Sequence, residues 1–344
     1  MHFYLRHTFL LLLSVILLAT ACSDDDGPLL TPPAPGEKKV YLLFSPNGLG
    51  DMSFNDRILS AASTFVLEQE NMSIDYLSPA DYAEGEEFFL QWLNTATSKD
   101  STIMVLPDHA YEAFVEKHKN LIDPARHCIL LPDSRRDDLP AHTLYISYYG
   151  ACYWAGLLQT STFGEEYQTA ILKANNQNIV LNEMEDGFAQ GVTDGGSRIA
   201  HTWVLDPEGT GGYDQVQEAY ELAAQLPEAN VTTLFAIAGG SNMGIYRFTR
   251  EFPGSFLVPG IDVDQSGISP DVPFSLLKHI DRLLAEHLKL WAEGEPQPAS
   301  PHIVGLAEGY TDLVISERYK ELYPDYVQYK DIAIQKEAAY ERTE

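Results

Sequence analysis

The chain has 344 residues, of which 45% are hydrophobic and 21% charged, so it can bury a large core and its composition excludes a disordered protein. Its 50 acidic residues outnumber 22 basic ones and give a formal net charge of -28, which disfavours nucleic acid and anionic lipid surfaces as partners. We expect a globular protein of one long domain or two medium ones, with no nucleic-acid partner.

The N-terminus has the pattern of a secretion signal. Arg6 precedes an apolar run from Phe9 to Ala19, and two small residues follow before Cys22. This run is too short to span a membrane, so we expect a cleaved signal peptide over residues 1–21. The ending Leu-Ala-Thr-Ala-Cys resembles the bacterial lipobox, which implies that Cys22 carries acyl chains such as palmitate and anchors the protein to the membrane.

Residues 22–38 are predicted to form a lipidated tether, because the segment is polar, rich in Pro and Gly, and unable to pack a core. Its acidic run, Ser23 to Asp26, resembles the signal that exports some Gram-negative lipoproteins to the outer surface, and an ordinary solvated tether explains it equally well. We therefore place the protein in the bacterial cell envelope, on the periplasmic face or at the cell surface.

Two cysteines remain in the body of the chain, Cys128 and Cys152, and both lie in apolar surroundings. We expect two buried free thiols. A disulfide between them stays open, because spacing alone cannot support one.

Short β-rich runs alternate with helical patterns in the first half of the chain. The runs are continuously apolar, which is typical of a parallel sheet covered by helices on both faces. Strands are expected at 39–45, 73–78, 102–108, 128–134 and 143–149, and helices at 54–70, 86–96 and 110–118. The pattern predicts a doubly wound α/β layer.

A second series of the same kind follows. Strands are expected at 167–174, 200–206, 232–240 and 255–264, helices at 214–226 and 273–292, and a last strand-like run at 302–315. Two similar α/β halves, with late segments that must return to the first half, predict two lobes joined by several crossovers around a cleft. Ligands of open α/β sheets bind at the carboxyl ends of the strands, so the cleft is the expected site.

Polar residues follow the predicted strands where that cleft would lie. Glycines in these turns let the backbone approach a ligand closely, and Ser53 is expected to cap the helix that follows the first strand. The candidate ligand-binding residues are Ser45, Asn47, Asp51, Phe54, Asn55, Asp108, Gly240, Asn242, Asp262 and Lys278.

Phe54 and Asp262 have the most specific chemistry among these candidates. An aromatic side chain in a polar loop offers a stacking face for a planar ligand, worth about 1–3 kcal/mol by analogy with base stacking. A carboxylate at a strand end accepts two hydrogen bonds from a vicinal diol, each worth about 1.5–3 kcal/mol. Lys278 is expected on a helix, where spacing alone favours a surface lysine.

Taken together, the motifs resemble those of the basic membrane protein family of substrate-binding lipoproteins, and the resemblance covers nearly all of the mature chain. They occur in the family's order: GDMSFND (50–56), YWAG (153–156), AGGSNMG (238–244), GIDVDQ (260–265), SLLKHID (275–281) and VGLAEGYTDL (304–313). The resemblance implies an α/β fold of the type I periplasmic-binding-protein kind, with two Rossmann-like lobes of parallel sheets joined by crossover hinges. The expected boundaries are 39–146 with 264–297 for lobe 1, 147–263 with 298–330 for lobe 2, and 331–344 for a C-terminal tail.

The resemblance also implies roles for individual residues. In nucleoside receptors that look like this chain, the Phe matching Phe54 stacks on the base beside Asn55, and the Asp matching Asp262 holds the ribose hydroxyls. The helix lysine of the family matches Lys278. Two positions depart from the pattern: Ser45 stands where a base-reading Asp is frequent, and Asn242 replaces a glycine and is expected to project towards the cleft.

We therefore expect a non-enzymatic receptor that captures a small polar ligand, a nucleoside, and presents it to an ABC permease. A surface-exposed or sensory binding module that is not coupled to import is the alternative. A nucleoside-processing hydrolase is the rival class, in which Asp51 and Asp108 would form a carboxylate pair. The sequence lacks a Gly-x-Ser-x-Gly elbow, a His-Glu-x-x-His motif and a Walker loop, so no catalytic residue, metal or cofactor is expected.

Overall fold

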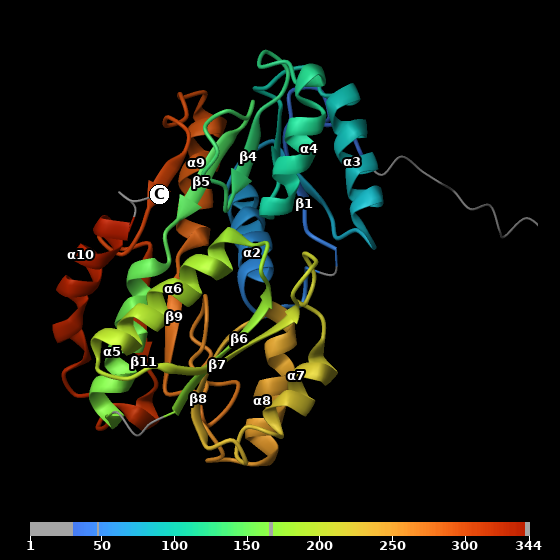
Figure 1. Cartoon of the computed structure of the whole chain (residues 1–344). Helices are drawn as coiled ribbons and strands as arrows, with labels where there is room; N and C mark the ends of the chain where they lie inside the picture. The colour runs from blue at the N-terminus through green and yellow to red at the C-terminus, as the bar shows by residue number, and fades with distance from the viewer. Residues whose placement is uncertain (1–29, 47, 165–167, 341–344) are drawn as a thin grey trace, which may run out of the picture. The chain divides into compact units, whose positions relative to one another are not determined.

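The computed structural model describes residues 30–46, 48–164 and 168–340 (Figure 1). The predicted signal peptide, the lipidated Cys22 and the candidate Asn47 lie outside the described residues. Contacts divide the chain into two units, Met1–Thr31 and Pro32–Glu344, and the second unit holds the helices and strands of the described residues. No helix in the described ranges is both long enough and apolar enough to cross a membrane.

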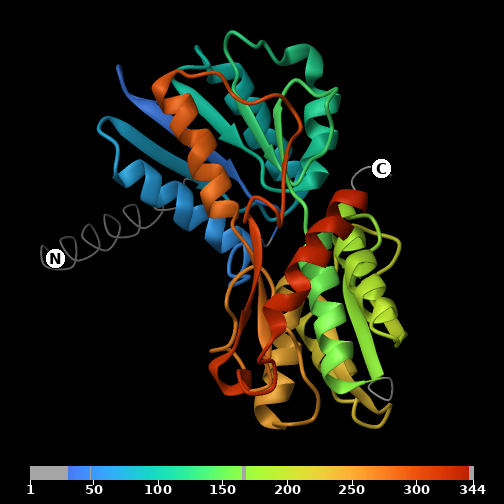
Figure 2. The same ribbon diagram turned by 90° about the vertical axis from the view of Figure 1, so that its left-hand side faces the viewer.

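The second unit contains two lobes, and the first is built on a six-stranded parallel sheet in the order β10-β5-β4-β3-β1-β2 (Figure 2). The five strands predicted for this half are confirmed, with boundary shifts of at most three residues. The strands are β1 (Lys38–Leu43), β2 (Met72–Leu77), β3 (Thr102–Val105), β4 (Ile129–Pro132), β5 (His142–Ile146) and β10 (His302–Val304).

Helices cover both faces of this sheet, because successive side chains of a strand point to opposite sides. Val40 and Leu42 of β1 belong to a core shared with α2 (Phe54–Leu67) and α9 (Ile280–Glu293). Tyr41 points the other way and meets Phe88 of α3, with ring centroids 6.5 Å apart. Helices α3 (Tyr82–Thr95) and α4 (Glu112–Lys117) follow β2 and β3.

The second lobe has a three-stranded parallel sheet in the order β7-β6-β8. Its strands are β6 (Gln168–Asn175), β7 (Ile199–Asp206) and β8 (Val231–Ile237), and its helices are α5 (Tyr149–Phe163), α6 (Ile179–Asp194), α7 (Val216–Ala223) and α8 (Asn242–Glu251). A β-carbon at Gly191 of α6 would lie 2.1 Å from the carbonyl oxygen of Tyr153 on α5, so these helices approach at a distance that only glycine permits.

Two expectations about secondary structure in the second half are wrong. The predicted strand 255–264 is not a strand, and this segment contributes only isolated bridges at Leu257 and Gly260. The predicted helix 273–292 is a strand followed by a helix: β9 (Phe274–Lys278) pairs antiparallel with β11 (Thr311–Ile315), and α9 begins at Ile280. The pairing with β11 buries Phe274 and Leu276 in the second core, and this tertiary contact overrides the helical pattern.

Three elements lie elsewhere than the expected lobe boundaries place them. Strand β10, expected in lobe 2, extends the sheet of lobe 1 by pairing with β5. Strand β9, expected in lobe 1, packs in the core of lobe 2. The expected C-terminal tail is the helix α10 (Lys330–Tyr340), which packs along α5, where Tyr340 stacks on Tyr149 with centroids 4.1 Å apart.

Two buried glutamates hold the segments that cross between the lobes. Glu183 of α6 accepts hydrogen bonds from the backbone N–H groups of Tyr148 and Tyr149, where β5 passes into α5. Glu337 of α10 accepts from the N–H of Gly150 in the same crossover and from that of Leu306 in the crossover after β10. Each carboxylate therefore satisfies backbone donors that would otherwise be buried without partners.

The two cysteines of the body are free and buried, as expected. Cys128 lies in the core of lobe 1 and Cys152 in the core of lobe 2. Burial raises the pKa of Cys128 to about 12, so this thiol stays protonated and unreactive at neutral pH.

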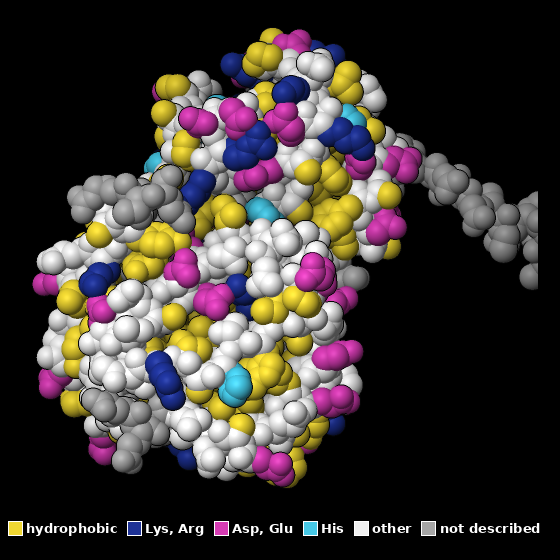
Figure 3. Space-filling model, viewed as in Figure 1, with side chains coloured by type: hydrophobic (Ala, Val, Ile, Leu, Met, Phe, Trp, Pro, Cys, Tyr) yellow, Lys and Arg dark blue, Asp and Glu magenta, His cyan; other side chains and the backbone are white. Residues whose placement is uncertain are grey.

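On the face shown in Figure 3, acidic and basic side chains are interspersed over both lobes. Basic side chains do not gather into a patch on that face, in keeping with the excess of acidic residues in the sequence.

Candidate functional site

A cavity of about 470 Å³ lies between the two lobes. Its walls come from segments that follow β1, β3 and β4 in lobe 1 and β6, β7 and β8 in lobe 2, together with Asp262 and Lys278. This volume falls in the range of pockets that enclose small molecules. Apart from Asn47, which is not described, all the candidate ligand-binding residues line this cavity. Within the described residues, no cluster of three or more His, Cys, Asp or Glu could hold a metal ion.

Asp51 organises the loop at the start of α2. Its carboxylate accepts hydrogen bonds from the N–H groups of Ser53 and Asn55, both at 2.9 Å, and from the N–H of Asp56 at 3.3 Å. It is therefore Asp51 that caps the helix, and the expectation that Ser53 does so is wrong, because the Ser53 side chain makes no capping bond. Burial raises the pKa of Asp51, and these N–H donors oppose the rise.

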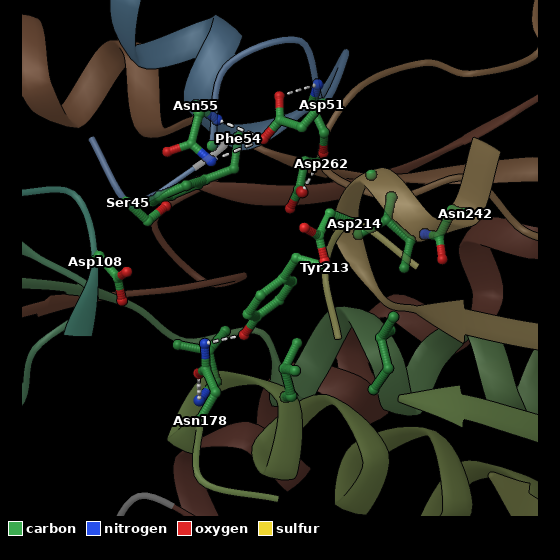
Figure 4. Close-up of a pocket in the computed structure, with 18 of the residues that line it drawn as sticks. Ser45, Asp51, Phe54, Asn55, Asp108, Asn178, Tyr213, Asp214, Asn242 and Asp262 are labelled. Atoms are coloured by element: carbon green, nitrogen blue, oxygen red, sulfur yellow. Dashed lines mark hydrogen bonds between the residues drawn. The ribbon is translucent and has the colours of Figure 1, made fainter. Parts of the chain in front are cut away.

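Asn55 lines the cavity and carries a buried acceptor. Its Nδ2 donates to Asp51 at 3.0 Å, which fixes the orientation of the amide. The Oδ1 atom is buried and has no hydrogen-bond partner among the described residues. Figure 4 shows this amide beside Phe54, between Asp51 and Ser45. A ligand N–H donor would satisfy an oxygen that is otherwise costly to bury.

Phe54 is the first residue of α2 and serves both core and cavity. Its ring packs partly against the core of lobe 1, and the ammonium group of Lys278 lies 4.7 Å from the ring centroid. The core anchors the ring while the cavity leaves part of it open, as a stacking face requires.

Lys278 is buried, with 2% of its surface exposed, so the surface lysine favoured by spacing alone is ruled out. The sequence predicted that Lys278 lies on a helix. It is instead the last residue of β9, because Phe274–Lys278 pairs with β11. Its Nζ donates to Asp133 at 2.7 Å. Asp133 lines the cavity and was missed, although it lies at the carboxyl end of a predicted strand, the same signal that identified Asp108.

Asp262 lies opposite the start of α2 and is held from two sides. Its N–H donates to the hydroxyl of Tyr148 at 3.0 Å, and its Oδ2 accepts from the Ser53 hydroxyl at 2.5 Å. Its backbone adopts a left-handed conformation, with φ of 65°. Burial raises the pKa of the Asp262 carboxyl, while the Lys278 ammonium and the Ser53 hydroxyl favour its ionised form.

Asp108 lies in the loop after β3 and accepts hydrogen bonds from the hydroxyl of Tyr82 and the N–H of Ala110, both at 2.9 Å. The Asp108 carboxylate raises the pKa of the adjacent His109. Both Asp51 and Asp108 therefore use oxygens to hold their own loops.

Two candidates on the second lobe shape the wall through their backbone. Asn242, which was expected to project towards the cleft, lines the cavity, and its side-chain amide also holds its own turn by accepting from the N–H of Ala238 and donating to the carbonyl of Ala236. A β-carbon on Gly240 would lie 2.9 Å from the carbonyl oxygen of Tyr213, so this close approach requires glycine.

Tyr213 is a second aromatic residue of the cavity and was missed. Its hydroxyl accepts from Asn178 Nδ2 at 2.8 Å, and Figure 4 shows the ring on the side of the cavity across from Phe54. Tyr213 follows the glycine-rich stretch 209–212 after β7, and that position after a strand was the available signal.

Ser45 lines the cavity near the end of β1, and a β-carbon at Gly48 would lie 2.7 Å from its hydroxyl oxygen.

Known proteins similar to this chain include an uncharacterized lipoprotein, a basic membrane protein and a solute-binding protein of known structure. No family model matches the chain. It is 22% identical over 305 residues to an uncharacterized lipoprotein of Pyrococcus abyssi, a match that covers 86% of this chain and 74% of the relative. It is 30% identical over 105 residues to basic membrane protein D of Borreliella burgdorferi, covering 30% of this chain and 31% of the relative.

The fold is similar to that of an ABC transporter system solute-binding protein from Aeropyrum pernix, with a TM-score of 0.71, 19% identity, and coverage of 88% of this chain and 92% of the other. The architecture is thus that of a type I periplasmic solute-binding protein, and the predicted α/β fold is confirmed. The predicted resemblance to basic membrane proteins is confirmed as well.

Proposed function

We propose that this chain is a lipid-anchored solute-binding protein of the bacterial envelope, which captures a nucleoside between its lobes and presents it to an ABC permease. The observation that carries the proposal is the convergence of Phe54 and Asp262, from different lobes, on one cavity. An aromatic face and an ionised acceptor match the two ends of a nucleoside, its planar base and its ribose diol.

The base end is supported by three side chains. Phe54 and Tyr213 offer two aromatic faces, and base stacking on such a face contributes about 1–3 kcal/mol. The Oδ1 of Asn55, which has no hydrogen-bond partner among the described residues, would accept a hydrogen bond from a base N–H.

The ribose end is supported by the charges around Asp262. Burial raises the pKa of Asp262, while the buried Lys278 ammonium, which is held in place by Asp133, favours the ionised carboxylate. Hydroxyl groups that donate to an ionised acceptor contribute about 1.5–3 kcal/mol each. With carboxylates at Asp51, Asp108, Asp133 and Asp262, the cavity repels anionic ligands such as phosphate esters.

Binding without turnover is supported by how the carboxylates are used. Asp51, the proposed partner of Asp108 in a hydrolase, has both oxygens engaged by donors of its own loop, so it is poorly placed to activate water. Affinity would come from closure of the lobes around the ligand, which removes water from its hydrogen bonds.

The proposal is tested with purified protein lacking residues 1–37. A panel of adenosine, guanosine, inosine, uridine and cytidine is screened by thermal shift, since a ligand at a hundred times its Kd adds about 2.7 kcal/mol of stability. D262A should abolish binding while leaving the fold intact. D264A is the matched control, because Asp264 lies two residues away and is exposed, and it should bind as wild type does.

A flat response across the panel would exclude nucleosides as the ligand class. Mass spectrometry of the incubated ligand should show no new product, and turnover would contradict the receptor function.

The alternative, a surface or sensory receptor not coupled to import, is favoured by the acidic run Ser23–Asp26. Protease treatment of whole cells separates the two, because a protein on the periplasmic face is protected and a surface-exposed one is digested.

A further inference from the structure

The side chain of Ser53 has a use that its position does not suggest. A serine immediately before a helix ordinarily accepts a hydrogen bond from the N–H groups of the first turn. In this protein the Asp51 carboxylate takes those donors, and the Ser53 hydroxyl donates to Asp262 Oδ2 at 2.5 Å instead. Ser53 is 7% exposed, so little water competes for its hydroxyl.

This hydrogen bond crosses the cleft. Ser53 immediately precedes α2, whose Ile58 and Ala62 belong to the core of lobe 1. Asp262 follows Ile261, which belongs to the core of lobe 2. The bond therefore ties the proposed ligand acceptor of one lobe to the helix start of the other.

We propose that Ser53 is a positioning residue that holds Asp262 as an oriented, ionised acceptor and thereby sets the preference of the cleft for ligands with a vicinal diol. This inference rests on the proposed function. Because the Ser53 hydroxyl donates to Oδ2, it fixes the direction of the carboxylate, and we assign the second oxygen, Oδ1, to the ligand hydroxyls.

The charged groups around Asp262 oppose one another, so the Ser53 hydroxyl affects whether the Asp262 carboxyl is ionised. The charged or titratable groups that face it are Lys278 at the end of β9, Asp51 before α2, Asp133 after β4, Tyr148 and Cys152 at α5, and Tyr246 on α8. Burial and the two carboxylates favour the protonated form, and Lys278 and Ser53 oppose them. If the Ser53 hydroxyl is removed, Lys278 alone opposes protonation of Asp262. The pKa of Asp262 then rises, and its carboxyl becomes a weaker hydrogen-bond acceptor.

The test compares S53A, S53T and the control S60A in the protein lacking residues 1–37. Ser60 is an exposed serine on the same helix, so its replacement leaves the cleft unchanged. Titration calorimetry measures the Kd of each protein for the panel nucleoside that wild type binds and for its 2′-deoxy and 3′-deoxy forms.

We expect S53A to lose about 10-fold or more in affinity for the ribonucleoside and much less for the deoxy forms, which removes most of the discrimination between them. Binding by S53A should also weaken at a higher pH than binding by wild type as the pH is lowered. S53T keeps a hydroxyl and should restore both the discrimination and the pH profile.

The inference is overturned if S53A retains the wild-type discrimination and pH profile, or if it weakens the ribo and deoxy ligands equally. S53C serves if S53A does not fold, because a thiol is close in size and a weaker donor, and wild-type discrimination by S53C would also overturn the inference. If wild type binds no nucleoside, the proposed function fails first. If wild type binds and S53A is indistinguishable from it, the positioning role alone fails.

Discussion

At the scale of single residues, the site depends on a few buried charges that compensate one another. Lys278 lies beside Asp133, and its charge also favours the ionised form of Asp262. Removing one partner from such a cluster leaves the others buried without compensation, which destabilises a fold far more than the loss of an exposed ion pair does.

We predict that K278M lowers the free energy of unfolding by about 3–5 kcal/mol at pH 7. The reason is that the carboxylates of Asp133 and Asp262 then lack their cation. Urea unfolding measures the loss, and K289M is the control, because Lys289 lies on the surface of α9 and its replacement should change little. An unchanged unfolding midpoint for K278M would contradict the compensating role of the lysine.

The burial of His287 makes the stability of the fold depend on pH. It lies in α9 with 1% of its surface exposed, and its Nε2 is hydrogen-bonded to His302 Nδ1 at 2.8 Å. Burial lowers the pKa of His287 from 6.5 to about 4, and the neighbouring His302 and His142 add to the lowering. The unfolded chain therefore binds a proton below pH 6.5 that the folded chain refuses until about pH 4.

Stability should fall as the pH drops from 6.5 to 4, by about 3 kcal/mol from this group. Unfolding in urea at several pH values measures the slope, and H287Q should flatten it, since glutamine does not titrate. A slope that survives H287Q would assign the acid sensitivity to other groups.

How far the site can be predicted is also decided residue by residue. Phe54 and Asp108 were predicted because the segments that follow parallel strands line the cleft, whatever the details of the loop. Asp262 was predicted on the same ground, although the segment 255–264 that carries it is not a strand. The destination of the Ser53 hydroxyl and of the Asn242 amide depends on which donors lie within 3 Å in three dimensions, and no spacing in the sequence encodes that.

At the scale of the elements, the continuous apolar strands of both parallel sheets were predicted because burial on both faces leaves a strong signal. Strand β9 was missed because Phe274–Lys278 runs directly into an amphipathic helix and continues its apolar spacing. Helix α10 was missed because only Ala333 and Glu337 among its residues are buried, which leaves no apolar stripe to read.

The contact between α5 and α6 gives a prediction at this scale. A β-carbon at Gly156 would lie 2.2 Å from the carbonyl oxygen of Phe188, so G156A must push two buried helices apart. We expect a loss of about 1–3 kcal/mol, as for other overpacked cores. G267A is the control, since nothing lies within 4 Å of a β-carbon there, and it should leave the melting temperature nearly unchanged.

At the scale of the whole molecule, the cleft depends on how two separately cored lobes meet. Their cores share no residue, so each can move as a body about the chain segments that cross between them. The Ser53–Asp262 bond, the Lys278–Asp133 pair and the ion pair between Arg135 and Glu183 then act at their junction.

Glu337 gives these movements a mechanical constraint. One carboxylate oxygen accepts from the N–H of Gly150 in the first turn of α5, and the other accepts from the N–H of Leu306 after β10. Because both crossover segments are bound to the same helix, α10, we expect them to move together. The two lobes should then open along a single path, and not by independent rotations about each crossover. E337A should uncouple the two crossover segments, and X-ray scattering of the ligand-free protein should then show a broader distribution of particle dimensions. An unaltered scattering profile would contradict the coupling role of Glu337.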